Sequence, residues 1–179
     1  MKRKAFFKKI LRYQQTDAWC GPAAIQMVLA AGGIRKTQKE IAKNVSHYWW
    51  GTTQQLIFAY LSKYYSRLNF KENTTFANVT YHLKKKHIIM VNWFDDDPAR
   101  NIDYNATNEF DYGHYSLLID YDTKKRRVTL LDPSESNGFR QVDVKEFKQK
   151  WYDYLDVYGQ RWLDGWMLWV DTDSKIKGV

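Results

Sequence analysis

The stretch YQQTDAWCGPAAIQMVLAAGG, residues 13–33, contains the single cysteine of the chain, Cys20. Gly-Pro follows the cysteine directly, and small and apolar residues then predict a helix over 21–31. Proline is favoured in the first turn of a helix, where its missing N–H costs nothing, and Gly32-Gly33 is typical of a helix end. The sequence therefore places its one thiol at the N-terminus of an apolar helix, and we expect one face of that helix to be buried.

The segments downstream change character along the chain. A capping-box pattern at Thr37 predicts a second helix, and apolar periodicity predicts a third over about 53–65 and a fourth over about 76–85. Residues 87–94 then read as a buried strand, 95–113 as a polar loop, 114–122 and 127–134 as a hairpin, 142–155 as a late helix and 165–171 as a final strand. Helices followed by an antiparallel sheet with one more helix indicate the α+β class.

Length and composition limit the kinds of protein that remain. The 179 residues suit one domain over 1–179, and 44% hydrophobic content predicts a folded chain. One cysteine excludes an internal disulfide, so folding needs no oxidising compartment. Basic residues at 8, 9 and 12 interrupt any signal-peptide core, and no apolar run approaches a membrane span. A cytoplasmic location is the expectation.

The net charge of +8 raises the question of an anionic partner. The basic runs are short, scattered and placed where turns are expected, and no nucleic-acid-binding motif accompanies them. A solvated surface is therefore favoured over a nucleic-acid or membrane footprint. The lone cysteine and dispersed histidines lack metal-ligand spacing, so we expect neither a metal nor another cofactor.

Cys20 has two interpretations. A single cysteine is most often a small buried hydrophobe. At a helix N-terminus, however, unpaired backbone N–H groups and the helix dipole favour a thiolate, which is the nucleophilic form. Gly21 next to it would let a substrate approach the backbone.

A nucleophilic thiolate needs a base, and His114 is the best candidate. It follows Gly113 at the point where a polar loop enters a strand, whereas His47, His82 and His87 read as surface or half-buried imidazoles. Asp132 ends the partner strand of the same hairpin, so it can lie beside His114 and fix the imidazole tautomer. Taken alone, Asp132 is better explained as a turn residue before proline, and only together with His114 do the two interpretations have equal weight.

Acyl transfer also needs a hydrogen-bond donor for the developing oxyanion. The side-chain amide of Gln14, six residues before the cysteine, would supply one together with the backbone N–H of Cys20. Gln15 is the competing candidate, and spacing alone does not decide between them.

Three motifs in order, QTDAWCGPAA (15–24), GHYSLLIDYD (113–122) and LLDPS (130–134), resemble the papain-like peptidases that process bacteriocin leaders at double-glycine sites. The similarity is greatest to the stand-alone branch without an attached transporter. It implies a papain-like fold, with the cysteine on a helix packed against a twisted antiparallel sheet. It also implies a peptide or protein substrate, a triad of Cys20, His114 and Asp132, and Gln14 as oxyanion donor.

Two features separate this sequence from the transporter-linked members. Trp19 stands where they carry an aspartate, which argues against double-glycine cleavage as the physiological task, and AAGG (30–33) reads as a helix cap rather than a self-processing site. The same triad would serve an acyl-transferring transpeptidase or amidase, and a papain-like domain can also bind peptides without catalysis. Tyr48, Trp49, Trp50 and Trp93 are candidate cleft residues, although packing in the core or at its rim is the more frequent role of such rings.

Overall fold

The computed structural model describes residues 2–47, 51–94, 113–154 and 162–176. Their centre is a six-stranded sheet of order β3-β10-β4-β5-β6-β7 in which every neighbouring pair is antiparallel. These strands are β3 (Leu68–Lys71), β4 (Ile88–Phe94), β5 (Gly113–Asp122), β6 (Arg127–Leu131), β7 (Phe139–Asp143) and β10 (Met167–Val170). Two short ribbons pair β1 (Ser46–His47) with β2 (Gly51–Thr52) and β8 (Tyr152–Tyr154) with β9 (Trp162–Asp164).

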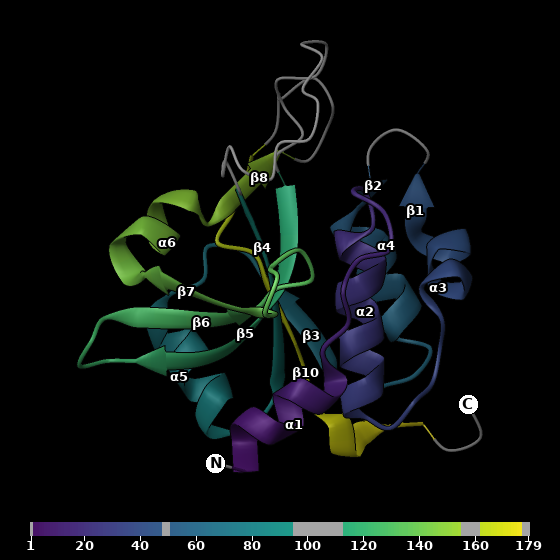
Figure 1. The fold of residues 1–179 in the computed structure, drawn as a ribbon, viewed down its shortest axis with the longest axis horizontal. Coiled ribbons are helices and arrows are strands. Elements are labelled where there is room, and N and C mark those ends of the chain that lie inside the picture. The colour runs from purple at the N-terminus through teal and green to yellow at the C-terminus, as the bar shows by residue number, and fades with distance from the viewer. Residues whose placement is uncertain (1, 48–50, 95–112, 155–161, 177–179) are drawn as a thin grey trace.

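The helices are divided between two sides of the sheet (Figure 1). On one side stand α2 (Cys20–Ala31), α3 (Gln38–Val45) and α4 (Gln54–Leu61), and on the other α5 (Phe76–Lys84) and α6 (Val144–Lys150). The N-terminal helix α1 (Lys2–Ile10) lies beside the end of α2, and a short 3-10 turn, η2 (Thr172–Ser174), follows the last strand. The arrangement confirms the α+β class predicted from the sequence.

The stretch of sequence that forms β4 is apolar at nearly every position and lacks the alternation of a half-buried strand. Ile88 and Met90 belong to the hydrophobic cluster on the α2 side, whereas Ile89, Val91 and Trp93 belong to the cluster beneath α5 and α6. Successive side chains of a strand point to opposite faces, so a strand covered on both faces needs apolar residues at nearly every position. Strand β4 therefore lies in the core, between the two hydrophobic clusters.

Helix α2 is more deeply buried than its sequence pattern suggested. Of the face formed by residues 23, 24, 27, 28 and 31, all but Ala31 are buried, and on the other side of the helix Ile25 and Leu29 also have no exposed surface. A helix that is apolar nearly all round is a core helix, and the one-face expectation was therefore too narrow. Its end is capped as predicted, because the chain turns at Gly33 with φ +76°, a conformation that glycine adopts without strain.

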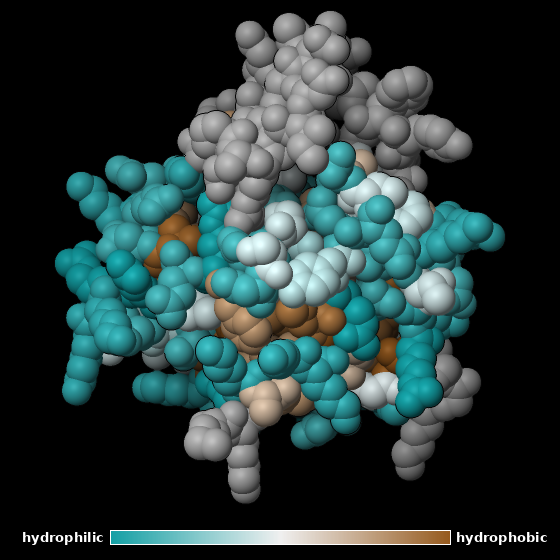
Figure 2. All heavy atoms as spheres, in the orientation of Figure 1, coloured by the Kyte–Doolittle hydropathy of each residue, from teal (hydrophilic) through white to brown (hydrophobic). Residues whose placement is uncertain are grey.

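Most helix and strand predictions are confirmed with shifted ends, and several elements were missed. Helix α6 is half the predicted length because the chain leaves it at residue 151 to form β8. Helix α1 and strands β3 and β7 were not predicted. The polar loop expected at 95–113 lies outside the described residues except for Gly113, which begins β5. Figure 2 shows a largely hydrophilic face with a small apolar area near its centre.

Candidate active site

The hairpin β5–β6 brings His114 and Asp132 together as predicted. His114 is the second residue of β5, Asp132 directly follows β6, and the strands pair through Leu117 and Leu131. The imidazole Nε2 lies 2.8 Å from Oδ1 of Asp132, within hydrogen-bond distance. The aspartate is fully buried and the histidine nearly so, with 8% of its surface exposed. The pair is therefore an interior contact and not a surface one.

The carboxylate of Asp132 is satisfied from several directions. The backbone N–H and the hydroxyl of Ser134 each donate to Oδ1 at 2.9 Å. Nη1 of Arg140, on β7, lies 3.8 Å from Oδ2, and the guanidinium stacks 4.6 Å from the ring centre of Trp93. A buried carboxylate stays ionised only where such donors and charges compensate for lost water. These contacts hold the Asp132 side chain in one orientation.

Cys20 begins α2 and faces this pair. The residue is partly exposed, and its side chain lies close enough to His114 to help raise the pKa of the imidazole. The residue before the helix, Trp19, supplies no side-chain cap, so among the described residues no side chain covers the first N–H groups of α2 in that way. The helix N-terminus therefore leaves a region of positive potential next to the sulfur.

The electrostatics of His114 follow from its surroundings. Burial lowers the pKa of an imidazole, but the negative charge of Asp132 and its hydrogen bond, followed by the contacts with Cys20, outweigh burial and raise the pKa of His114 to about 10. The imidazole is consequently protonated at neutral pH. An imidazolium between a carboxylate and a thiol is the arrangement that stabilises a thiolate.

Of the two glutamine candidates, Gln14 lies closer to the site. Its backbone N–H donates to the carbonyl of Pro133 at 3.0 Å, one residue beyond Asp132. Its side-chain Nε2 donates to Asp17 O at 3.1 Å, which leaves its second N–H for another acceptor. Gln15 is exposed, and its backbone N–H bonds to Gln38.

Gly21 has a different role from the one expected. A Cβ at this position would lie 2.6 Å from both Cβ and Oγ1 of Thr52, closer than real contacts allow. The space that the glycine leaves is therefore filled by Thr52 on β2, and the expectation of substrate access there was wrong. The missing side chain lets β2 pack directly against the start of α2.

The remaining histidines and aromatic residues are placed as follows. His82 is buried, contrary to expectation, and its Nδ1 lies 2.9 Å from Nδ1 of the half-buried His87, far along the chain from the site. Trp93 is fully buried, in the core as favoured. Tyr48, Trp49 and Trp50 lie outside the described residues, and the side chain of His47 is likewise not described. Sequence reasoning missed Ser134 and Arg140, because serine after proline and arginine in an edge strand carry no distinctive pattern.

Metal centres and membrane spans are two further features that the described ranges could contain. No group of three or more histidine, cysteine, aspartate or glutamate side chains there is arranged to hold a metal ion. Within the same ranges, none of the helices has both the length and the hydrophobicity to cross a bilayer.

Comparison with known proteins defines the class. The profile of the Peptidase C39-like family matches residues 7–158, so the chain belongs to this family. A C39-like peptidase from Bacillus anthracis, described as putative, superposes with a TM-score of 0.66 at 15% identity over 92% of this chain and 96% of that one. No curated protein matches the sequence.

Two further structures share the fold. The peptidase domain of Streptococcus ComA, a bifunctional ABC transporter of a quorum-sensing pathway, gives a TM-score of 0.62 at 14% identity, covering 89% of this chain and 96% of that one. A double-glycine-motif protease from an AMS/PCAT transporter, in complex with its leader peptide, gives 0.56 at 14% identity, covering 89% of each chain. These likenesses confirm the papain-like fold, and together with the family they support a cysteine peptidase.

Proposed function

We propose that this protein is a cysteine peptidase that hydrolyses a peptide or related amide bond within one catalytic domain. The observation that carries the proposal is His114 bonded to Asp132 at 2.8 Å and lying beside Cys20 at the start of α2. Family membership supports the same chemistry. A cytoplasmic location, expected from the sequence, is part of the proposal.

In the proposed mechanism Cys20 is the nucleophile and His114 the general acid and base. Because Nε2 of His114 is bound to Asp132, Nδ1 is the ring nitrogen left for the sulfur. The thiolate attacks the substrate carbonyl, and the imidazolium protonates the leaving amine. The neutral imidazole then takes a proton from water, which attacks the thioester and releases the acid. Asp132 keeps the ring oriented and stabilises its charged form.

The negative oxygen of the tetrahedral intermediate requires donors placed in advance. The backbone N–H of Cys20 at the open start of α2 and the second N–H of Gln14 are the proposed pair. Removing one such donor typically lowers kcat by about 10²–10³-fold. We therefore expect Gln14→Ala to be severe, Asp132→Asn to be milder, and Cys20→Ala to abolish turnover.

The test combines covalent labelling with turnover. At pH 6 a thiolate is alkylated by iodoacetamide, whereas an ordinary thiol barely reacts. We expect rapid labelling located on Cys20 by mass spectrometry, and loss of that reactivity in His114→Ala. Labelling no faster than that of the urea-unfolded chain would contradict the proposal and favour a binding domain without catalysis.

Turnover is measured with quenched fluorescent peptides, one of them carrying a Gly-Gly pair, because a structural neighbour is a double-glycine-motif protease. Cleavage that disappears in Cys20→Ala supports the proposal. Product analysis with an added amine separates hydrolysis from acyl transfer, since a transferase would join the acyl group to the amine. No cleavage of any peptide, with no acyl-enzyme on Cys20, would refute it.

A further inference from the structure

Gln38 has a buried side-chain amide, and its hydrogen bonds go to the segment that contains Gln14. It is the first residue of α3, with 2% of its surface exposed. Its Oε1 accepts from the backbone N–H of Gln15 at 3.0 Å, and its Nε2 donates to the carbonyl of Tyr13 at 2.7 Å. One side chain thus binds the main chain on both sides of Gln14.

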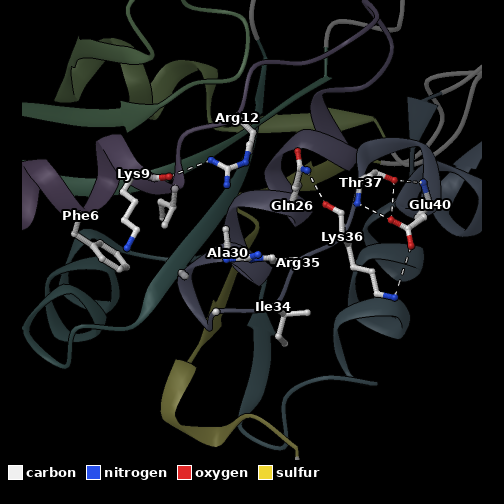
Figure 3. A pocket seen from close by; sticks show the side chains of 13 residues that line it. Phe6, Lys9, Arg12, Gln26, Ala30, Ile34, Arg35, Lys36, Thr37 and Glu40 are labelled. Atoms are coloured by element: carbon white, nitrogen blue, oxygen red, sulfur yellow. Dashed lines mark hydrogen bonds and ion pairs between the residues drawn. The ribbon is translucent and has the colours of Figure 1, made fainter. Parts of the chain in front are cut away.

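A second glutamine fixes the orientation of the first. Nε2 of Gln38 also donates to Oε1 of Gln26, on α2, at 3.1 Å. In Figure 3 the amide of Gln26 in turn points to Lys36, whose carbonyl accepts from its Nε2 at 2.6 Å. The adjoining capping box, in which Thr37 N–H donates to Glu40 at 2.7 Å, starts α3 and so fixes the backbone of Gln38. Each amide therefore has one orientation that satisfies its neighbours.

The segment that these amides hold has no regular structure of its own. Residues 11–14 belong to neither a helix nor a strand. A functional group must be held within about 0.5 Å of its productive position, which loops achieve only when side chains hold them. Here Gln38 holds residues 13 and 15, and Pro133 holds the N–H of Gln14. The Gln14 main chain is fixed on both sides and tied to the segment after Asp132.

We propose that Gln38, supported by Gln26, is a positioning residue for the oxyanion site formed by Gln14. The inference rests on the proposed function and adds that the oxyanion donor is aligned by a buried amide pair between α2 and α3. Gln38 does not touch the reacting atoms. Its effect on catalysis passes through Gln14 alone, and this separates a positioning role from general support of the fold.

The test compares Gln38→Met, which keeps length and removes both hydrogen-bonding groups, with Gln14→Ala and with the double variant. Turnover is followed with the aminomethylcoumarin amide of N-acetylglycylglycine. We expect Gln38→Met to lower kcat on the order of 10- to 100-fold with KM nearly unchanged, since the lost interaction acts in the transition state. The double variant should be no slower than Gln14→Ala alone, because residues that act through one group are not additive.

Two measurements separate this role from a structural one. The rate of Cys20 alkylation at pH 6 should equal that of the wild type, because the thiolate does not depend on Gln14. The matched control is Ser174→Ala: Ser174 is also buried, accepts from a backbone N–H (Arg67, 3.1 Å) and donates to a carbonyl (Asp171, 2.6 Å) away from the site. It should lower the melting temperature and leave kcat unchanged.

The outcomes are distinct. Wild-type kcat in a folded Gln38→Met variant, or losses that multiply in the double variant, would overturn this inference and leave the proposed peptidase intact. Absence of turnover and of Cys20 alkylation in the wild type would overturn both. Should Gln38→Met fail to fold, Gln26→Met removes the bond to Gln38 and the bond to the Lys36 carbonyl but leaves the bonds of Gln38 to residues 13 and 15. A smaller kcat loss that vanishes in the Gln14→Ala background then supports the inference. An unchanged kcat in Gln26→Met would then refute it.

Discussion

The charge of Asp132 should make the stability of this protein depend on pH in a predictable direction. The pKa of His114 is opposed by burial but raised to about 10, chiefly by Asp132, whereas an unfolded histidine titrates near 6.5. A group whose pKa is higher in the folded state contributes stability that is fully present below pH 6.5 and is lost as the pH rises through about 10. Replacing Asp132 by asparagine should remove most of this contribution.

The magnitude follows from the size of the pKa change. A rise from 6.5 to about 10 corresponds to at most about 5 kcal/mol, at roughly 1.36 kcal/mol per pH unit. Cys20 is best replaced by alanine in both proteins, so that the comparison isolates the interaction between His114 and Asp132. Since Cys20 supplies the smaller part of the rise, about 2–4 kcal/mol should remain in the Cys20→Ala background.

The assay is urea unfolding of Cys20→Ala and Cys20→Ala/Asp132→Asn between pH 6 and pH 10. The difference in unfolding free energy should be largest at pH 6 and shrink by about 2–4 kcal/mol toward pH 10. Ser134→Ala in the same background is the control, since it removes a 2.9 Å hydrogen bond to the same carboxylate without changing charge. Its cost, about 1 kcal/mol, should not vary with pH. A difference for Asp132→Asn that stays constant or grows with pH would refute the proposed ion pair.

Two further predictions concern the fold. Gly33 (φ +76°) and Gly138 (φ +72°) share a left-handed backbone, but a Cβ meets no atom within 4 Å at Gly33 and overlaps the side chain of Leu11 at Gly138. Gly33→Ala should therefore lower the free energy of unfolding by about 1 kcal/mol, and Gly138→Ala should lower it by about 1–3 kcal/mol more. Thermal unfolding measures both changes, and equal losses of stability would contradict this reasoning. Burial, and then the charge of His87, lower the pKa of His82 to about 4, so the protein should lose stability, at most about 3 kcal/mol, as the pH falls from 6.5 to 4. His82→Phe should flatten that part of the pH–stability curve, and an unchanged curve would show that His82 does not cause it.

The sequence predicted the elements that bury many residues and missed those that bury few. Strands β3 and β7 form the two edges of the sheet. Each has one buried residue, Leu68 in β3 and Val142 in β7, so neither shows an alternating pattern. Among its described side chains, helix α1 buries Phe7 and Ile10 and exposes the rest. Such segments are held by hydrogen bonds and contacts with distant parts of the chain, which local pattern does not record.

The predicted site residues show the same division. Cys20 at a helix start and His114 with Asp132 across a hairpin are local relations, and spacing reveals them. Arg140 approaches Asp132 only because β7 pairs with β6. Gln38, at the start of α3, bonds to Gln15 in the segment between α1 and α2. These supporting residues depend on how elements pack and were invisible in the sequence.

The site has a helix side, formed by α2 with Cys20 and the segment before it, and a sheet side, formed by the strands next to His114 and Asp132. The two sides must be aligned to within hydrogen-bond distance, and two hydrogen bonds between them supply this alignment. Gln14 N–H donates to Pro133 O at 3.0 Å, and the hydroxyl of Tyr115 donates to Thr52 O at 2.9 Å. Thr52 packs against the residue after Cys20, Tyr115 follows His114, and Pro133 follows Asp132. Each proposed catalytic residue thus has a chain neighbour that takes part in joining the two sides. The residues next to the proposed catalytic residues therefore have a physical role, because they hold the sulfur, the imidazole and the amide in fixed relative positions.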